Sequence, residues 1–227
     1  MASSDFAESD SVIRPENSRL CVRFVEALPV TGAAVSVFGG MVPETSICAS
    51  DPLAARLDEI QFDLGEGPRW ESVRSRLPVH EAYVQQSAHE NWPMFGAALK
   101  RTGVESLFVY PLSVAALDVG VVELYSLTPG PLSAQDHAIA RALASETAWT
   151  LLDHLLSMQE AARTTEPRDN APLSRREIHQ ATGMVLVQLE SNATEALLVM
   201  RAHAFSHDRS LRDVASDIVE RRLVFAA

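Results

Sequence analysis

Hydrophobic residues recur at helical spacing in three stretches near the C-terminus, and each stretch follows a residue that can cap a helix. A Glu or Asp stands three residues after each cap, which is the spacing of a capping box. The three pairs are Ser174–Glu177, Asn192–Glu195 and Ser210–Asp213. The apolar positions are Ile178, Ala181, Val185 and Leu189, then Ala196, Met200 and Ala204, then Leu211, Val214, Ala215, Ile218 and Val219. The pattern predicts a small all-α domain of three helices over residues 174–227.

Strand and helix patterns alternate before that domain, from residue 15 to residue 132. Strands are expected at 33–38, 45–49, 79–83, 106–112 and 119–125. Helices are expected at 15–27, 51–61 and 92–101, and a further short helix follows a turn at 64–68. The first two strands are expected to pair as a hairpin, and the last two as a central pair. This alternation favours an α/β domain with a central antiparallel sheet and flanking helices. Residues 1–14 are polar and rich in serine, which predicts a disordered tail.

A long helix is expected between the two domains, from residue 133 to residue 163. Its apolar stripe has spacings of four and three residues and consists of Ile139, Leu143, Thr147, Leu151, Leu155 and Met158. Near-heptad spacing favours a parallel dimer, although a helix packed on its own sheet is the alternative. Residues 164–173 contain Pro167 and Pro172 and are expected to form a linker.

Composition restricts the class of protein further. No apolar run approaches the roughly 18 residues of a membrane-spanning helix, and the N-terminus lacks the basic start and apolar run of a signal peptide. We therefore expect a cytoplasmic protein without a membrane anchor. Cys21 and Cys48 have no metal-binding or redox spacing, which favours reduced core residues, with a thiol sensor as the other option.

The net charge of −11 is unexpected for a nucleic-acid-binding protein, but it is distributed unevenly. Residues 174–227 contain seven arginines and seven acidic residues, so the acidic surplus lies entirely before residue 174. A neutral domain binds phosphate weakly unless dimerisation doubles its arginines, so affinity should depend on salt and on oligomeric state.

The order of residues in the C-terminal segment resembles that of an ANTAR domain, the RNA-binding antiterminator module of bacterial regulators. The resemblance lies in Ile178, in the run 180–184 (Gln-Ala-Thr-Gly-Met), and in matching residues of the two later helices. Those later residues are Glu195, Ala196, Met200, Arg201, Ala204, Ser210, Leu211, Val214, Ala215, Ile218 and Val219. The family usually carries a lysine where this chain has Thr182, so one phosphate or base contact is expected to be missing.

The resemblance implies a homodimer that binds paired RNA hairpins, each with a hexanucleotide loop, in nascent transcripts. Unpaired loop bases can be read by side chains, whereas the deep groove of duplex RNA cannot. The candidate RNA-binding residues are Arg175, Arg176, His179, Gln180, Thr182, Gly183, Arg201, Arg209 and Arg212. Gly183 inside a helix costs about 1 kcal/mol relative to Ala, which indicates close approach of a base or tight packing of a neighbouring helix.

The residues from about Leu20 to Leu156 resemble a GAF domain, and a GAF domain followed by an ANTAR domain is a familiar architecture of actinobacterial regulators. The similarity lies at residues 50–52, 64–68, 92–93, 103–106, 111–112 and 119–121. Many relatives have a cysteine after the Gly-Pro pair, but this chain has Arg69, so thiol chemistry is not expected there.

GAF domains often bind small molecules, and five aromatic residues are candidates for lining such a site, unless they only fill the core. They are Trp70, Trp92, Phe95, Phe108 and Tyr110. An enzyme would have to rely on Glu66, His80 and Glu81, without a nucleophile elbow or a phosphate loop. We therefore expect no catalytic residues, no metal site and no cofactor.

The sequence thus predicts an RNA-binding antitermination regulator with a GAF sensor. One alternative is a small-molecule sensor whose tail binds another protein. Another is a DNA-binding repressor, since residues 210–215 resemble the start of a helix-turn-helix. Only eight residues follow Val219, so a recognition helix is not expected.

Overall fold

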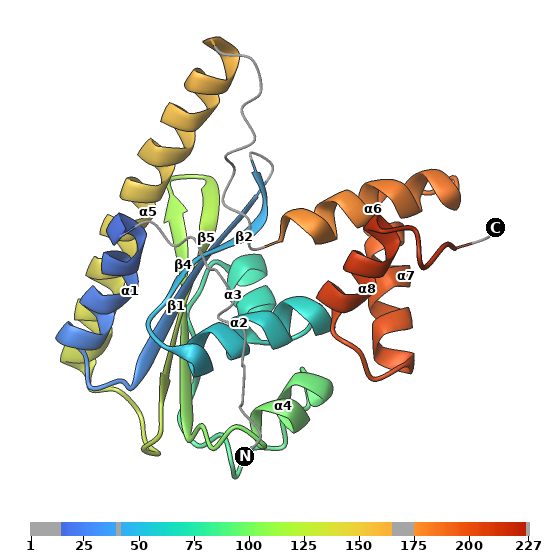
Figure 1. Ribbon diagram of the computed structural model, residues 1–227. Helices are drawn as coiled ribbons and strands as arrows, with labels where there is room; N and C mark the ends of the chain where they lie inside the picture. Colours follow the sequence, from blue (N-terminus) through green and yellow to red (C-terminus); the bar gives the residue numbers. More distant parts are fainter. Residues whose placement is uncertain (1–14, 40–41, 165–174, 226–227) are drawn as a thin grey trace, which may run out of the picture.

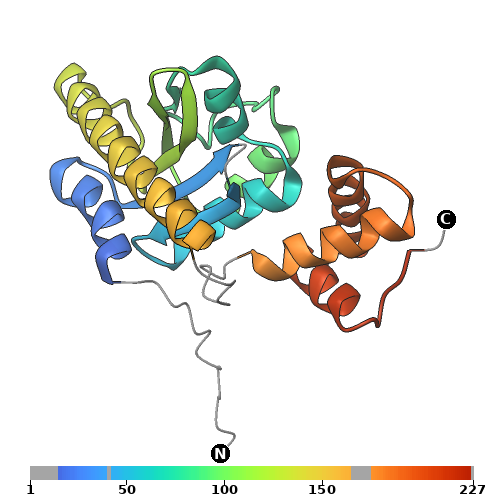
Figure 2. The same ribbon diagram turned by 90° about the horizontal axis from the view of Figure 1, so that it is seen from above.

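The computed structural model describes residues 15–39, 42–164 and 175–225. It places a helix-flanked sheet, which we call the sensor domain, beside three helices that we call the output module (Figures 1 and 2). The predicted tail at 1–14 and the linker at 165–174 lie outside the described residues.

The sensor sheet is antiparallel throughout, with strand order β2-β1-β5-β4-β3. Its strands are β1 (Gly32–Gly39), β2 (Val42–Ala49), β3 (Val79–Glu81), β4 (Ser106–Val114) and β5 (Leu117–Ser126). All five coincide with predicted strands, and both predicted strand pairs form. The fold class predicted from the sequence is therefore confirmed.

Helices cover both faces of this sheet (Figure 1). α1 (Pro15–Ala27) and α5 (Ala134–Thr164) pack on one face, and α2 (Pro52–Leu64), α3 (Pro68–Ser75) and α4 (Pro93–Leu99) pack on the other. Alternate residues of β4 enter two different cores, since Phe108 faces α1 and α5 while Leu107 and Val109 face α2 and α4. The output module contains α6 (Arg176–Gln188), α7 (Ala193–Ser206) and α8 (Leu211–Val219).

Helix α2 is fixed at both ends and lies between the sheet and the output module (Figure 1). Asp51 caps its N-terminus by accepting hydrogen bonds from the backbone N–H groups of Leu53 and Ala54, both at 2.9 Å. The hydroxyl of Tyr125 on β5 donates to the same carboxylate at 2.8 Å. Gly65 ends the helix in the left-handed conformation, with φ of 63°. The outer face of α2 is thereby held toward the output module.

The apolar stripe of α5 packs within its own chain. Leu151 is 3% exposed, and Ile139, Leu143 and Leu155 pack against the same core. The side chain of Met158 lies outside the described residues. The sequence analysis assigned this stripe to a dimer seam, but in the structure it covers the sheet and contacts α1. Helical periodicity identifies a buried face without identifying what buries it, and here the alternative interpretation holds.

Cys21 on α1 and Cys48 on β2 form a disulfide, in contrast to the reduced cysteines expected from the sequence. Both cysteines are buried in the core beneath α1. Their separation of 27 residues matches no known short motif. Only the packing of α1 on the sheet edge brings them together.

A fully buried arginine lies between the sheet and α2. Arg69 is 0% exposed and pairs with three carboxylates, those of Glu44, Asp58 and Glu123. Its Nε donates to Glu123 at 3.1 Å, and one Nη donates to Glu44 at 3.1 Å. Arg175, directly before α6, joins the cluster by donating to Glu44 at 2.9 Å and to Asp58 at 2.8 Å. Two cations and three carboxylates therefore share this site.

Burial and the two arginines together determine the protonation of the cluster. Burial alone would raise the pKa of Asp58, but Arg69 and Arg175 hold it below its ordinary value. Burial raises the pKa of Glu123 to about 7, and the attraction of Arg69 only partly opposes this shift. One Glu123 oxygen has no hydrogen-bond partner among the described residues. A proton on Glu123 neutralises the cluster, since two carboxylates then face two guanidinium groups.

We expect Leu151→Ala to lower the free energy of unfolding by about 2–5 kcal/mol, because it leaves a cavity in the sensor core. Urea denaturation monitored by circular dichroism measures this loss. Leu156→Ala, at a position that is 44% exposed on the same helix, is the matched control and should cost far less. Equal, small losses in the two variants would place Leu151 outside the core.

We also expect Glu123→Gln to remove a pH dependence of stability. The Glu123 pKa is raised from 4.5 to about 7 on folding, so its contribution is complete below pH 4.5 and is lost as the pH rises through 7. The wild type should lose on the order of 3 kcal/mol of this contribution between those limits, and the variant should not. Denaturant titrations at pH 5 and pH 8 measure the difference. The exposed Glu90→Gln variant should behave like the wild type, and a wild-type slope in Glu123→Gln would contradict this assignment.

Candidate nucleic-acid interface

The output module is built on one small core to which all three helices contribute. Its buried apolar residues are Ile178, Ala181, Val185, Ala196, Met200, Ala204, Leu211, Val214, Ala215 and Ile218. Each of these was predicted from the three stripes, and Leu189 and Val219 pack at the edge of the core. Asn192 and Glu195 form a complete capping box on α7, and Ser210 accepts from Asp213 N–H at 3.0 Å on α8. Ser174 lies outside the described residues.

The outer face of α6 carries a line of largely exposed residues. Arg176, Gln180, Gly183 and Val187 are spaced by four, three and four residues, which places them in one line along the helix. Arg176, Gln180 and Val187 are exposed. A Cβ added at Gly183 would meet nothing within 4 Å. Tight packing against the described residues therefore does not explain Gly183.

Thr182 lies inside the module, away from this outer face. Its hydroxyl donates to the carbonyl of Ile178 at 2.7 Å and lies 3.7 Å from the sulfur of Met200. The side chain is 8% exposed. A hydroxyl that bonds back to the helix is satisfied locally, so the Thr182 side chain is directed into the module and away from solvent.

Three candidate RNA-binding residues face the sensor domain. The guanidinium of Arg175 lies 3.7 Å above the ring centre of Phe62 and is paired with the sensor carboxylates described above. Arg201 donates to the backbone carbonyl of Phe62 at 2.7 Å. The Nε2 of His179 lies 3.0 Å from the backbone carbonyl of Glu44. The sequence analysis did not identify Glu44, Asp58 and Phe62 as partners of these residues. The one signal in the sequence was Arg69, because an arginine in place of a cysteine requires acidic partners if it is buried.

The remaining candidates lie at the surface of α8 and its preceding turn. Arg209 donates to Asp217 at 2.5 Å. Arg212 is 3.9 Å from Glu59 of the sensor domain, with half of its side chain exposed. The structure thus divides the nine candidate residues among the outer face of α6, the module core, the contact with the sensor and the surface of α8.

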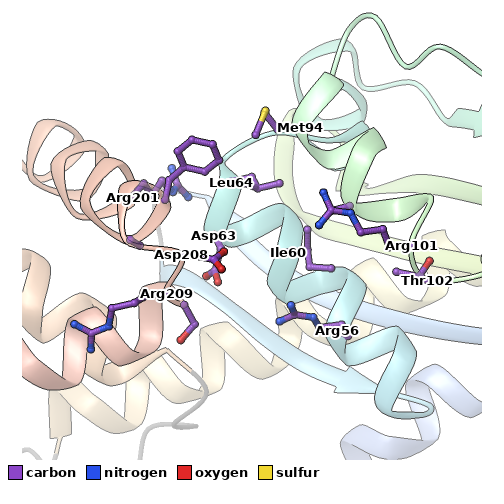
Figure 3. Close-up of a pocket in the computed structure, with 14 residues that line it drawn as sticks. Arg56, Ile60, Asp63, Leu64, Met94, Arg101, Thr102, Arg201, Asp208 and Arg209 are labelled. Atoms are coloured by element: carbon purple, nitrogen blue, oxygen red, sulfur yellow. The ribbon is translucent and has the colours of Figure 1, made fainter.

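A cavity of about 640 Å³ separates α2 and α4 from α7 and the turn before α8 (Figure 3). Arg56 and Arg101 line it from the sensor, and Arg201 and Arg209 line it from the module. Asp63 points from α2 into this space (Figure 3). Burial, with Glu59 nearby, raises the pKa of Asp63 to about 6. Four arginines and two aspartates line the cavity, so the charged groups of its lining are predominantly basic.

The five aromatic candidates for a sensor ligand do not line one pocket. Phe108 and Tyr110 belong to the core beneath α1 and α5, whereas Trp92 and Phe95 belong to the core beneath α2 and α4. Of the five, Trp70 and Trp92 line a common cavity, of about 650 Å³, next to the turn at Gly65. A strand sends alternate side chains to opposite faces, which separates residues that are close in sequence.

The residues considered for catalysis have structural partners. Glu66 accepts from the backbone N–H groups of Met94 and Phe95, at 2.7 and 3.0 Å, and so caps α4. Glu81 accepts from Ser87 at 2.6 Å, and the ring of His80 stacks on His137 at 4.2 Å. Within residues 15–39, 42–164 and 175–225, no group of His, Cys, Asp or Glu side chains is arranged to hold a metal ion. No described helix is long and apolar enough to cross a membrane.

Comparison with known proteins supports both halves of this architecture. Residues 169–219 match the family model of the ANTAR domain. The fold is similar to that of a domain from a protein described as a putative two-component sensor histidine kinase of Sinorhizobium meliloti 1021. That match has a TM-score of 0.51 at 15% identity and covers 68% of this chain and 99% of the other. The search of curated proteins returned no significant match.

The fold is also similar to that of the GAF3 domain of a Synechocystis sp. PCC6803 protein in its photoproduct state. The TM-score is 0.50 at 14% identity, with 64% of this chain and 98% of the other covered. Identities this low show the fold alone. The chain therefore has a GAF–ANTAR architecture, in which a sensor domain with the GAF fold precedes a segment that matches the ANTAR domain.

Proposed function

We propose that this chain is a non-enzymatic, cytoplasmic regulator that binds RNA hairpin loops through its output module and promotes transcription antitermination. The observation that carries the proposal is the outer face of α6, where Gly183 is open to an approaching partner beside Arg176 and Gln180. A glycine lets a base or backbone approach a helix closely, and an arginine beside it can hold a phosphate. The match of this segment to the ANTAR domain supports the same function.

We further propose that the chain forms a homodimer through the exposed side of α5. Trp149 on that side is 61% exposed and offers a large apolar area that a second helix can bury. Arg141 and Glu146 flank it at the positions that form ion pairs between parallel helices, and Glu146 also pairs with Arg23 of α1. The exposed residues that follow a heptad pattern on this side are Ala138, Ala142, Ser145, Trp149 and Leu156.

This proposed seam takes the place of the stripe containing Leu151, which the sequence analysis assigned to the dimer but which packs in the sensor core. Small side chains at its first three positions let a second helix approach closely, while Trp149 and Leu156 supply apolar area. Leu152, the heptad position between those two, is 7% exposed and packs in the sensor core. The seam therefore borders the core of each protomer.

We also propose that the cavity at Trp70 and Trp92 is the site of any small-molecule ligand of the sensor. Two indole rings beside Glu71 and Arg74 provide apolar area with a few polar groups at its edge. This combination suits a small organic molecule with an aromatic or aliphatic body.

The function is tested by titrating the protein with a two-hairpin RNA, a scrambled RNA and duplex DNA. We expect preference for the hairpin RNA and a linear fall of log affinity with log salt, at about −0.7 per phosphate contact. Preference for duplex DNA would favour the repressor alternative, and the absence of nucleic-acid binding would favour a sensor whose tail binds a protein.

The same titrations on variants of α6 separate base recognition from phosphate attraction. Gly183→Leu should weaken binding of the correct hairpin at least about tenfold by blocking its approach, while Gly183→Ala serves as the small matched control. Both should fold, because the space beside Gly183 is open. Arg176→Ala should weaken correct and scrambled loops by similar factors, since phosphate contacts carry little sequence information. If the Gly183→Leu variant folds and still prefers the correct hairpin over the scrambled RNA, the bases are recognised by α7 or α8 instead.

The dimer is tested by Trp149→Asp, which places a charge on the proposed seam without entering the core. Light scattering should show that this variant is monomeric while the wild type is dimeric. Thr150→Asp, at the neighbouring exposed position outside the heptad line, is the control and should remain dimeric. A dimeric Trp149→Asp variant would place the interface elsewhere.

A further inference from the structure

We infer that the sensor domain binds the output module through α2 in a way that competes with RNA. This inference rests on the proposed RNA-binding function of the module. The output module of the same chain occupies the outer face of α2. The contact involves Phe62, Gly65 and the acidic residues around Arg175.

Phe62 is a sensor residue whose side chain completes the core of the module. It projects from α2 and is 1% exposed, yet it belongs to the cluster formed by Ile178, Met200 and Leu211 rather than to either sensor core. An aromatic ring buried in this way gives up its contact with water only while the two domains are together. Phe62 therefore stabilises the docked arrangement without being needed for the fold of the sensor.

Charge complementarity reinforces this apolar contact. Arg175 is 5% exposed and is bound by Glu44, Asp58 and the face of the Phe62 ring. Carboxylates bind both Nη atoms of this guanidinium, and its burial keeps a phosphate from reaching it while the domains are docked. The acidic surplus of the chain lies in the sensor segment, so docking brings the module arginines against opposite charge.

Docking also occupies further residues assigned to RNA. Arg201 is bound to the carbonyl of Phe62, and His179 lies against the carbonyl of Glu44. An RNA backbone that approached these side chains would meet the partly exposed carboxylates of Glu59 and Asp63, whose negative charge repels phosphate. RNA must separate the domains to use this face, whereas the outer face of α6 and the surface of α8 stay accessible in the docked chain.

Gly65 connects this contact to the cavity proposed for a sensor ligand. It lines the cavity that contains Trp70 and Trp92, and a Cβ at this position would come within 2.8 Å of a terminal nitrogen of Arg201. The same turn ends α2 three residues after Phe62. A molecule that shifts this turn therefore acts directly on the contact that retains Arg201.

The test uses full-length Phe62→Ala and Phe62→Ser variants, which remove the ring without adding charge. Leu77→Ala and Leu77→Ser, at a sensor position that is 63% exposed, are the matched controls. Small-angle X-ray scattering reports separation of the domains without RNA, and titration with the hairpin RNA reports affinity. Circular dichroism confirms that each variant folds.

We expect both Phe62 variants to have a larger radius of gyration and to bind the hairpin RNA about fivefold or more tightly than the wild type, with no change in the controls. Folded Phe62 variants with unchanged scattering would overturn the docking. Expanded variants with equal or weaker RNA affinity would overturn the competition. If no form of the protein binds RNA, the proposed function fails and the competition with it, while the scattering still decides whether the domains dock.

Discussion

A buried guanidinium group requires compensation by opposite charge, and Arg69 imposes this requirement on the centre of the molecule. It is 0% exposed, and an unpaired charge at that depth would be far more costly than any single apolar contact could offset. Its partners come from β2, α2 and β5, so the pairing fixes α3 against the sheet and α2 at the same time. Three carboxylates surround this single positive charge, and two of them, Glu44 and Asp58, also pair with Arg175. The position of the output module thus follows from how the sensor balances one internal cation.

Local patterns in the sequence were sufficient to predict the elements and most of the module core. The capping box at Asn192 and Glu195 acts within one helical turn, and the stripe from Ile178 to Val185 is buried as its spacing requires. The strand pairs of the sheet followed from alternation and from the short turns between them. In each case the interaction that determines the structure lies within a few residues of the signal.

Pairings between distant segments were not predictable in the same way. The stripe containing Leu151 was correctly identified as buried, but its partner was the chain's own sheet. Cys21 and Cys48 meet because α1 packs beside β2, which no spacing encodes. Arg175 and Arg201 are expected at the surface from the sequence pattern, and only the arrangement of the two domains turns them toward Phe62. The candidate site was therefore predicted as a set of residues, whereas its division between an outer face and a docked face was not.

The acidic surplus of the chain lies before residue 174, on the domain that docks against the neutral output module. A neutral module attracts RNA weakly, and an acidic neighbour repels it further, so a permanently docked module would be a poor RNA-binding protein. Under the proposed RNA-binding function, the same acidic residues give the module an alternative partner, with carboxylates in place of phosphates and Phe62 in place of a stacked base. Both partners would bind the same guanidinium groups of the module. A small change in the affinity of either partner therefore changes which of the two is bound. Under the proposed competition, a ligand that displaces α2 from the module would free Arg175 and Arg201 for RNA.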